Sequence, residues 1–149
     1  MEDKIRETMG KAFHDLHENL RVQVRGLDSG TLNWRPLPKA NSVAVLVTHT
    51  LGSELEMIRS VRSMPAQRDR DSEFRAEADT AQLLEMIDAA DREMGELIAA
   101  LTAADMTDLR PRGDRTPEAG IYWLITNYGH AREHLAQIEL TKQLYDSRT

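Results

Sequence analysis

Two histidines lie four residues apart near the end of the chain, His130 and His134. On a helix, side chains four positions apart project from one face about one turn from each other. Such a pair can bind a single divalent ion, with metal–nitrogen distances of about 2.0–2.1 Å. Pairs with this spacing are also common on helix surfaces, so the pair indicates a metal site only together with a third ligand.

A third histidine, His49, lies in the most apolar stretch of the chain. A buried imidazole must satisfy both of its ring nitrogens. It therefore either hydrogen-bonds a neighbouring helix or faces His130 and His134 as a third ligand. Three histidines that leave a fourth position open are typical of catalytic metal sites. The sequence thus indicates a three-histidine site, with a structural core histidine as the alternative.

The remaining two histidines, His14 and His17, are three residues apart. Their neighbours are charged, namely Lys11, Asp15, Glu18 and Arg21. We interpret this as a wet helix face, and we expect His14 and His17 to face solvent rather than to bind metal.

Other polar side chains are candidates for the same pocket. Trp123, Asn127 and Gln137 follow the helical line of His130 and His134, beside the apolar stripe. The two amides can hydrogen-bond a ligand or orient an imidazole, and Trp123 can form an apolar wall. Glu54, five residues after His49, can supply a carboxylate. The alternative for all four is ordinary packing or a surface position.

Four segments must position these residues, and each repeats apolar side chains every three or four positions, as amphipathic helices do. They run from about Ile5 to Val24, Ser42 to Arg62, Leu83 to Leu101 and Thr116 to Tyr145. No other segment has the pattern of a strand. Four such helices imply an all-α fold, a four-helix bundle, as a single domain over residues 1–149.

The helix ends are marked by residues that favour caps. Gly26 is a natural stop for the first helix, and Ser42 is a natural N-cap for the second. Asp79 or Thr80 can cap the third, and Thr116 followed by Pro117 is a start signal for the fourth. The links 27–41 and 63–79 are long enough for a crossover, so the order of the helices stays open.

Composition excludes several classes of protein. The chain has no cysteine, which rules out disulfides, thiolate metal sites and a cysteine nucleophile. Its net charge of -6 and lack of a basic stripe argue against a nucleic-acid partner. There is no apolar run long enough to span a membrane and no secretory signal, so we expect a cytoplasmic protein without a membrane partner.

Two stretches resemble a known family. They are Ser42-Val-Ala-Val-Leu-Val-Thr-His49-Thr-Leu-Gly-Ser-Glu54 and Asn127-Tyr-Gly-His130-Ala-Arg-Glu-His134-Leu-Ala-Gln137-Ile138. The first is similar to the serine-led second helix of the DinB-like superfamily, also called DinB/YfiT-like metalloenzymes. The second is similar to its H-x-x-x-H-x-x-Q-I signature on the last helix. The resemblance extends over essentially the whole chain as four helices.

The resemblance implies a DinB-like four-helix bundle in which His49, His130 and His134 hold a divalent ion, nickel or zinc. It also implies a homodimer, and transfer or isomerisation reactions that use a low-molecular-weight thiol. The first functional hypothesis is therefore a metalloenzyme for a small molecule, either a thiol-dependent transferase or a hydrolase that uses metal-bound water. The second is a non-catalytic binding or regulatory bundle with a structural or vestigial metal site.

Without cysteine, the chain cannot supply a thiol from its own side chains. Any sulfur nucleophile would therefore enter as a co-substrate.

Overall fold

The computed structural model, which describes residues 1–148, contains four long helices, of which the second and third begin at the caps that the sequence predicts. They are α1 (Glu2–Val24), α3 (Val43–Val61), α5 (Thr80–Ala99) and α7 (Gly120–Asp146). Ser42 caps α3 by accepting a hydrogen bond from the Val45 amide at 3.1 Å. Asp79 caps α5 in a reciprocal capping box with Gln82. Gly26 follows α1 with a φ of +76°, a backbone conformation that glycine adopts at low cost.

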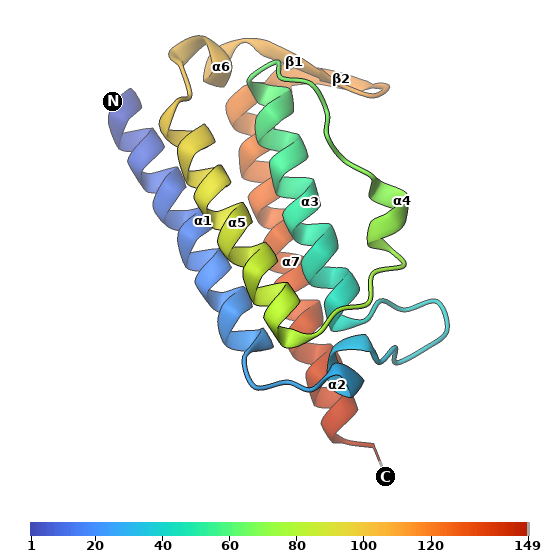
Figure 1. Cartoon of the computed structure of the whole chain (residues 1–149). Coiled ribbons are helices and arrows are strands. Elements are labelled where there is room, and N and C mark those ends of the chain that lie inside the picture. Colours follow the sequence, from blue (N-terminus) through green and yellow to red (C-terminus); the bar gives the residue numbers. More distant parts are fainter. Residues whose placement is uncertain (149) are drawn as a thin grey trace.

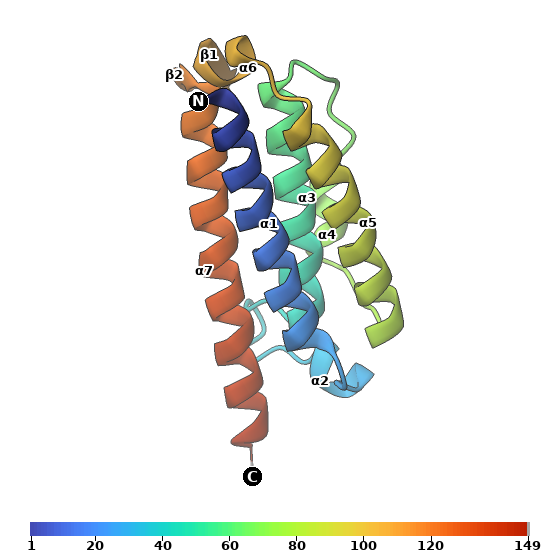
Figure 2. The same cartoon turned by 90° about the vertical axis from the view of Figure 1, so that its left-hand side faces the viewer.

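The helices form a bundle in which α1 packs against α5, α3 packs against both α5 and α7, and α1 meets α7 less extensively. Helices α1 and α7 run in one direction and α3 and α5 in the other (Figure 1; Figure 2). The link between α3 and α5 must therefore return along the length of the bundle. This is the crossover that the sequence left open, and it carries the short helix α4 (Arg70–Glu73) beside α3.

One sequence prediction about the last helix is wrong. Residues Thr116 and Pro117 do not begin a helix but lie in the strand β2 (Arg115–Ala119), which pairs antiparallel with β1 (Leu109–Arg112). Helix α7 begins only at Gly120. The expectation that the chain has no strand is therefore wrong as well. The tight turn is possible because Gly113 takes a φ of +57°, and a proline is tolerated in a two-stranded sheet whose strands are both edges.

Two further short helices, α2 (Ser29–Asn33) and α6 (Ala103–Thr107), interrupt links that the sequence predicts as irregular. Helix α6 packs against the start of α7. The contact requires Gly120, because a Cβ atom there would lie 1.9 Å from the carbonyl oxygen of Asp105. This contact fixes the start of α7 at one end of the bundle, together with the hairpin that β1 and β2 form.

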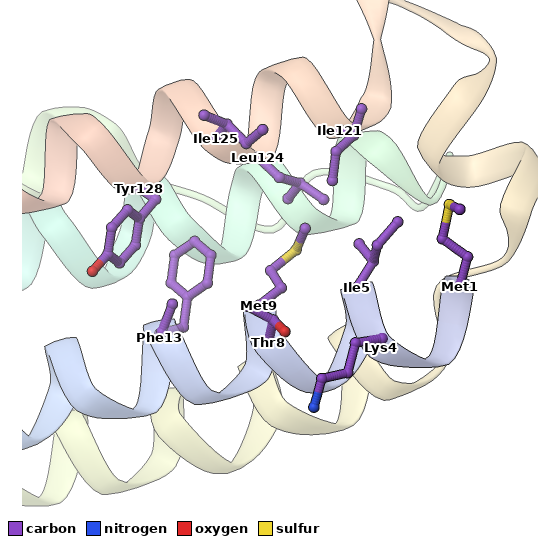
Figure 3. A pocket seen from close by; sticks show the side chains of 11 residues that line it. Met1, Lys4, Ile5, Thr8, Met9, Phe13, Ile121, Leu124, Ile125 and Tyr128 are labelled. Carbon is purple, nitrogen blue, oxygen red and sulfur yellow. The ribbon is translucent and has the colours of Figure 1, made fainter.

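The core is formed by the apolar stripes that the sequence predicts, and it includes Phe13, Leu20, Ile58, Ile87 and Leu124. Between the first halves of α1 and α7 the packing leaves an apolar groove of about 400 Å³. Figure 3 shows side chains of both helices facing each other across it. At its inner end the rings of Phe13 and Tyr128 meet edge to face, with centroids 5.4 Å apart. Within residues 1–148, no helix is both long and apolar enough to cross a membrane.

Candidate metal centre

A cavity of about 430 Å³ lies where α3, α7, the α4 crossover and the hairpin meet. All three histidines of the predicted site line it, His49 from α3 and His130 and His134 from α7. The ring centroids of His49 and His134 are 5.0 Å apart, and those of His130 and His134 are 6.2 Å apart. The fold thus brings together residues that are 81 positions apart in the sequence.

Each of the three imidazoles has an oxygen atom next to its Nδ1 atom. His49 Nδ1 lies 3.1 Å from Glu73 Oε1, and His134 Nδ1 lies 3.1 Å from Gln137 Oε1. His130 Nδ1 lies 3.3 Å from Glu133 Oε2. These oxygens are acceptors and favour the tautomer that carries its proton on Nδ1. At His49 the Arg68 guanidinium, which can only donate, also lies 3.2 Å from Nδ1 and acts in the opposite direction. With the proton on Nδ1, the Nε2 lone pair of a ring is available to a metal ion. The hydrogen bonds to Glu73 and Gln137 orient the rings of His49 and His134.

The most buried of these contacts is the one between His49 and Glu73. The Glu73 side chain is only 7% exposed, and both of its oxygens accept hydrogen bonds of 2.8 Å from Arg68. It reaches α3 through a gap at Gly52, where a Cβ atom would lie 2.0 Å from Glu73 Oε2. Arg68 is held in turn by Glu56. A buried ion pair therefore supports the imidazole of His49 from behind.

Burial also affects the protonation of His49. Desolvation lowers the pKa of its imidazole, and the nearby positive charges of His134 and Arg68 lower it further, against the hydrogen bond to Glu73. The ring of His49 is thus kept neutral to a lower pH than an ordinary histidine. A histidine must be neutral to bind a metal ion, so this environment favours a ligand role.

Of the four other predicted pocket residues, Trp123 and Asn127 line the cavity. Trp123 is buried, and its Nε1 donates to the Arg110 carbonyl at 2.9 Å. The Asn127 amide nitrogen donates to Ser53 Oγ at 3.0 Å, whereas its Oδ1 is buried without a partner within residues 1–148. Gln137 does not line the cavity, but its contact with His134 is the orienting role that the sequence suggested.

The prediction that Glu54 lies in this pocket is wrong. Glu54 is fully buried on another side of α3, and its Oε2 lies 2.7 Å from His17 Nε2. The reason is helical geometry, since five residues from His49 amount to one turn plus about 140°. His17 is also fully buried, with its Nδ1 2.8 Å from Asp91 Oδ1, so the expectation that it faces solvent is wrong too. His14 is exposed, as expected.

The histidines are close together, but they do not form a ready coordination shell. Across residues 1–148, no three or more histidine, aspartate or glutamate side chains are arranged to hold an ion. Three imidazoles on one tetrahedral ion have centroids roughly 5 Å apart. The His49–His134 pair matches this separation, whereas His130 is displaced toward Glu133 on a side chain that is 63% exposed. The donor types fit a divalent ion, and a three-histidine shell would require His130 to move toward the other two rings.

Sequence reasoning missed Glu73, Arg68 and Gly52. Glu73 and Arg68 lie in the charged stretch between the second and third long helices, which has no apolar periodicity to predict a buried position. Gly52 directly follows the most apolar part of α3, and a helical glycine at such a place is a weak signal of close approach.

Comparison with known proteins agrees with this architecture. A sequence model of the DinB superfamily matches residues 12–138. The chain belongs to the DinB superfamily. The match includes most of the bundle and all three histidines of the cavity. Metal binding is common in the DinB superfamily, although the comparison identifies neither a metal nor a site in this member.

Solved structures are similar over almost the whole chain. A conserved protein from Enterococcus faecalis superposes with a TM-score of 0.78 at 14% identity, covering 95% of this chain and 97% of the other. A structure described as the sibling lethal factor precursor DfsB superposes with a TM-score of 0.73 at 17% identity, covering 97% and 98%. At these identities the likeness shows the DinB fold alone. No curated protein matches the chain.

Proposed function

We propose that this DinB protein binds one divalent metal ion through His49, His130 and His134. The observation that carries the proposal is the common arrangement of the three imidazoles in one cavity. Each has an oxygen next to Nδ1, and a proton on Nδ1 leaves Nε2 to bind the ion. For His130 this requires the exposed ring to approach the other two.

We further propose that the protein is an enzyme for a small molecule. Imidazole ligands suit both zinc and nickel, so the donor set does not favour one of the two. Bound in this cavity, such an ion would supply Lewis-acid chemistry, which serves a thiol-dependent transfer or a hydrolysis. Because the chain contains no cysteine, a thiol would have to enter the cavity as a co-substrate. The homodimer implied by the family resemblance stays a prediction.

The protein's own side chains have separable tasks in this proposal. Glu73 and Arg68 hold His49 in place, and Trp123 supplies an apolar wall beside the ligand positions. Asn127 Oδ1 is free to accept a hydrogen bond from an N–H or O–H group of the substrate, which would satisfy a buried acceptor that has no partner now.

The first test is elemental analysis of protein purified without an affinity tag and then loaded with Zn²⁺ or Ni²⁺. We expect close to one ion per chain, and loss of that ion in His49→Ala. A folded wild-type protein that takes up no metal would contradict the proposal.

The second test addresses catalysis. Loaded protein is screened against a panel of thiols and electrophiles, with His134→Ala as the inactive control. Turnover that requires both metal and His134 supports the enzyme. Stoichiometric metal without turnover on the panel supports the non-catalytic bundle with a structural metal site.

A further inference from the structure

The lining of the cavity is strongly basic. Four arginines line it, Arg68 and Arg70 from the crossover and Arg112 and Arg115 from the hairpin. The chain as a whole has six more acidic than basic side chains. A cluster of positive charge in one cavity of an acidic protein indicates a site for anions.

Three of these arginines are not neutralised by the protein. Arg68 is paired with Glu56 and Glu73. Arg70 lies over the ring of Phe74, with its guanidinium carbon 5.3 Å from the centroid, and Arg112 contacts only the Met57 sulfur at 3.8 Å. Within residues 1–148, the side chains of Arg70, Arg112 and Arg115 form no ion pair with a carboxylate of the protein. Their guanidinium groups are therefore available to a ligand.

The hairpin places two of these arginines opposite each other, so that their like charges repel. Arg112 and Arg115 are direct partners in the antiparallel register, on either side of the turn at Gly113. Side chains of such partners start from Cβ atoms about 4.5–5.5 Å apart, and like charges in these positions destabilise the pair. An anion bound between the two guanidinium groups would remove this repulsion. The register is thus an observation, independent of the cavity lining, that points to an anionic ligand.

The formal charge of the metal-free cavity is compatible with a ligand that carries two negative charges. Four arginines face Glu56 in the lining and Glu73 behind His49, which leaves two positive charges when the histidines are neutral. Guanidinium groups bind carboxylate and phosphate oxygens in pairs of parallel hydrogen bonds. A ligand with two negative charges would balance the protein groups without any contribution from a metal ion.

We propose that the substrate of this cavity is a small dianion, either a dicarboxylate or a phosphate monoester. The inference rests on the proposed function, because it names the substrate class of the same site. Arg112 and Arg115 bind one anionic group from the hairpin, and Arg70 contributes from the crossover. The rest of the molecule extends toward His49 and His134. The arginines thereby select substrates by charge.

The test uses metal-free protein, so that it does not depend on the ion. Binding of succinate, inorganic phosphate and the neutral analogue succinamide is measured by calorimetry and by the fluorescence of Trp123, with Trp123→Phe to assign the signal. We expect succinate or phosphate to bind and succinamide not to. Tighter binding of succinate assigns a carboxylate substrate, and tighter binding of phosphate assigns a phosphate ester.

The deciding variant is Arg112→Ala/Arg115→Ala, which we expect to weaken anion binding at least ten-fold. Its matched control is Arg25→Ala/Arg132→Ala, which removes the same charge from exposed positions outside the cavity. Equal binding of succinate, phosphate and succinamide, or unchanged anion binding by the folded double variant, would overturn the inference. Zn²⁺ uptake by the same variant separates the two proposals, since we expect it to remain near one ion per chain.

Discussion

At the scale of single residues, the candidate centre depends on how His49 is held. Its imidazole is oriented by Glu73, which is paired with Arg68 and enters the wall of α3 only because position 52 is a glycine. Carboxylates behind metal-binding histidines fix the tautomer and raise the basicity of the ligand nitrogen. Glu73 should therefore influence metal affinity without touching the ion.

Glu73→Gln tests this role directly. The substitution keeps the size of the side chain but removes the charge that favours the Nδ1–H tautomer of His49. We expect the Zn²⁺ affinity to fall by about 10- to 100-fold. Calorimetric titration measures it, with Glu77→Gln as a control at an exposed position of the same link. An unchanged affinity in Glu73→Gln would show that the contact is structural only.

Gly52→Ala tests the same contact from the other side. The added methyl group would lie 2.0 Å from Glu73 Oε2, so the carboxylate must leave its position behind His49. We expect a loss of Zn²⁺ affinity comparable to that of Glu73→Gln. Gly95→Ala is the matched control on α5, because a Cβ atom there meets no atom within 4 Å. It should bind Zn²⁺ normally and be about 1 kcal/mol more stable in urea unfolding.

At the scale of elements, the sequence predicts the long helices well and the hairpin not at all. Apolar periodicity and caps such as Ser42 and Asp79 are local signals, and the structure follows them. The pair Thr116 and Pro117 is a local signal too, but tertiary structure overrides it. The better indication was Gly113-Asp114 between Arg112 and Arg115, a two-residue loop typical of a hairpin. Hairpin and crossover supply all four arginines of the cavity.

Gly120→Ala tests how the hairpin and α6 are joined to α7. A Cβ atom at this position would collide with the backbone oxygen of Asp105, which cannot move without shifting α6. We expect a loss of about 1–3 kcal/mol in the free energy of unfolding. In Gly129→Ala, on the same helix, a Cβ atom meets nothing within 4 Å, so this control should gain stability. Equal stability of Gly120→Ala and wild type would contradict the tight contact.

At the scale of the whole molecule, two polar centres lie on different sides of α3. One is the histidine cavity, and the other is the buried pair of His17 and Glu54, which Asp91 and Arg21 extend toward solvent. Periodicity predicted neither the helix order nor the second centre. The long links are compatible with more than one order of the helices. The charged residues beside His17 led to the wrong prediction that its side chain is exposed. The bundle follows from local patterns, whereas its polar interior depends on which helices meet.

The buried centre predicts how stability depends on pH. Burial lowers the pKa of His17, but the hydrogen bonds to Glu54 and Asp91 outweigh it, so the pKa is raised above its ordinary value of 6.5. A raised histidine pKa stabilises the fold fully below about pH 6.5, and that contribution is lost as the pH rises through the folded-state pKa. The lowered pKa of His49 has the opposite effect, but only near and below its ordinary value of 6.5. Urea unfolding between about pH 7 and pH 9 should therefore show decreasing stability.

His17→Gln should remove this decrease and lower stability at pH 6, because it leaves the buried Glu54 without a charged partner. Glu54 does not oppose this decrease in stability. Burial raises the pKa of Glu54, so its contribution to the stability of the fold also becomes less favourable as the pH rises. His14→Gln, at the exposed neighbour, should retain the wild-type profile. A pH profile of His17→Gln that is as steep as that of wild type would show that another group causes the decrease.

The central claim is that His49, His130 and His134 together hold one ion, and X-ray absorption at the zinc edge tests it most directly. For protein loaded with one Zn²⁺ per chain, we predict three imidazole nitrogens at about 2.0–2.1 Å. His130→Ala should show two. A coordination shell without imidazole, or one that is the same in wild type and His130→Ala, would contradict the three-histidine centre.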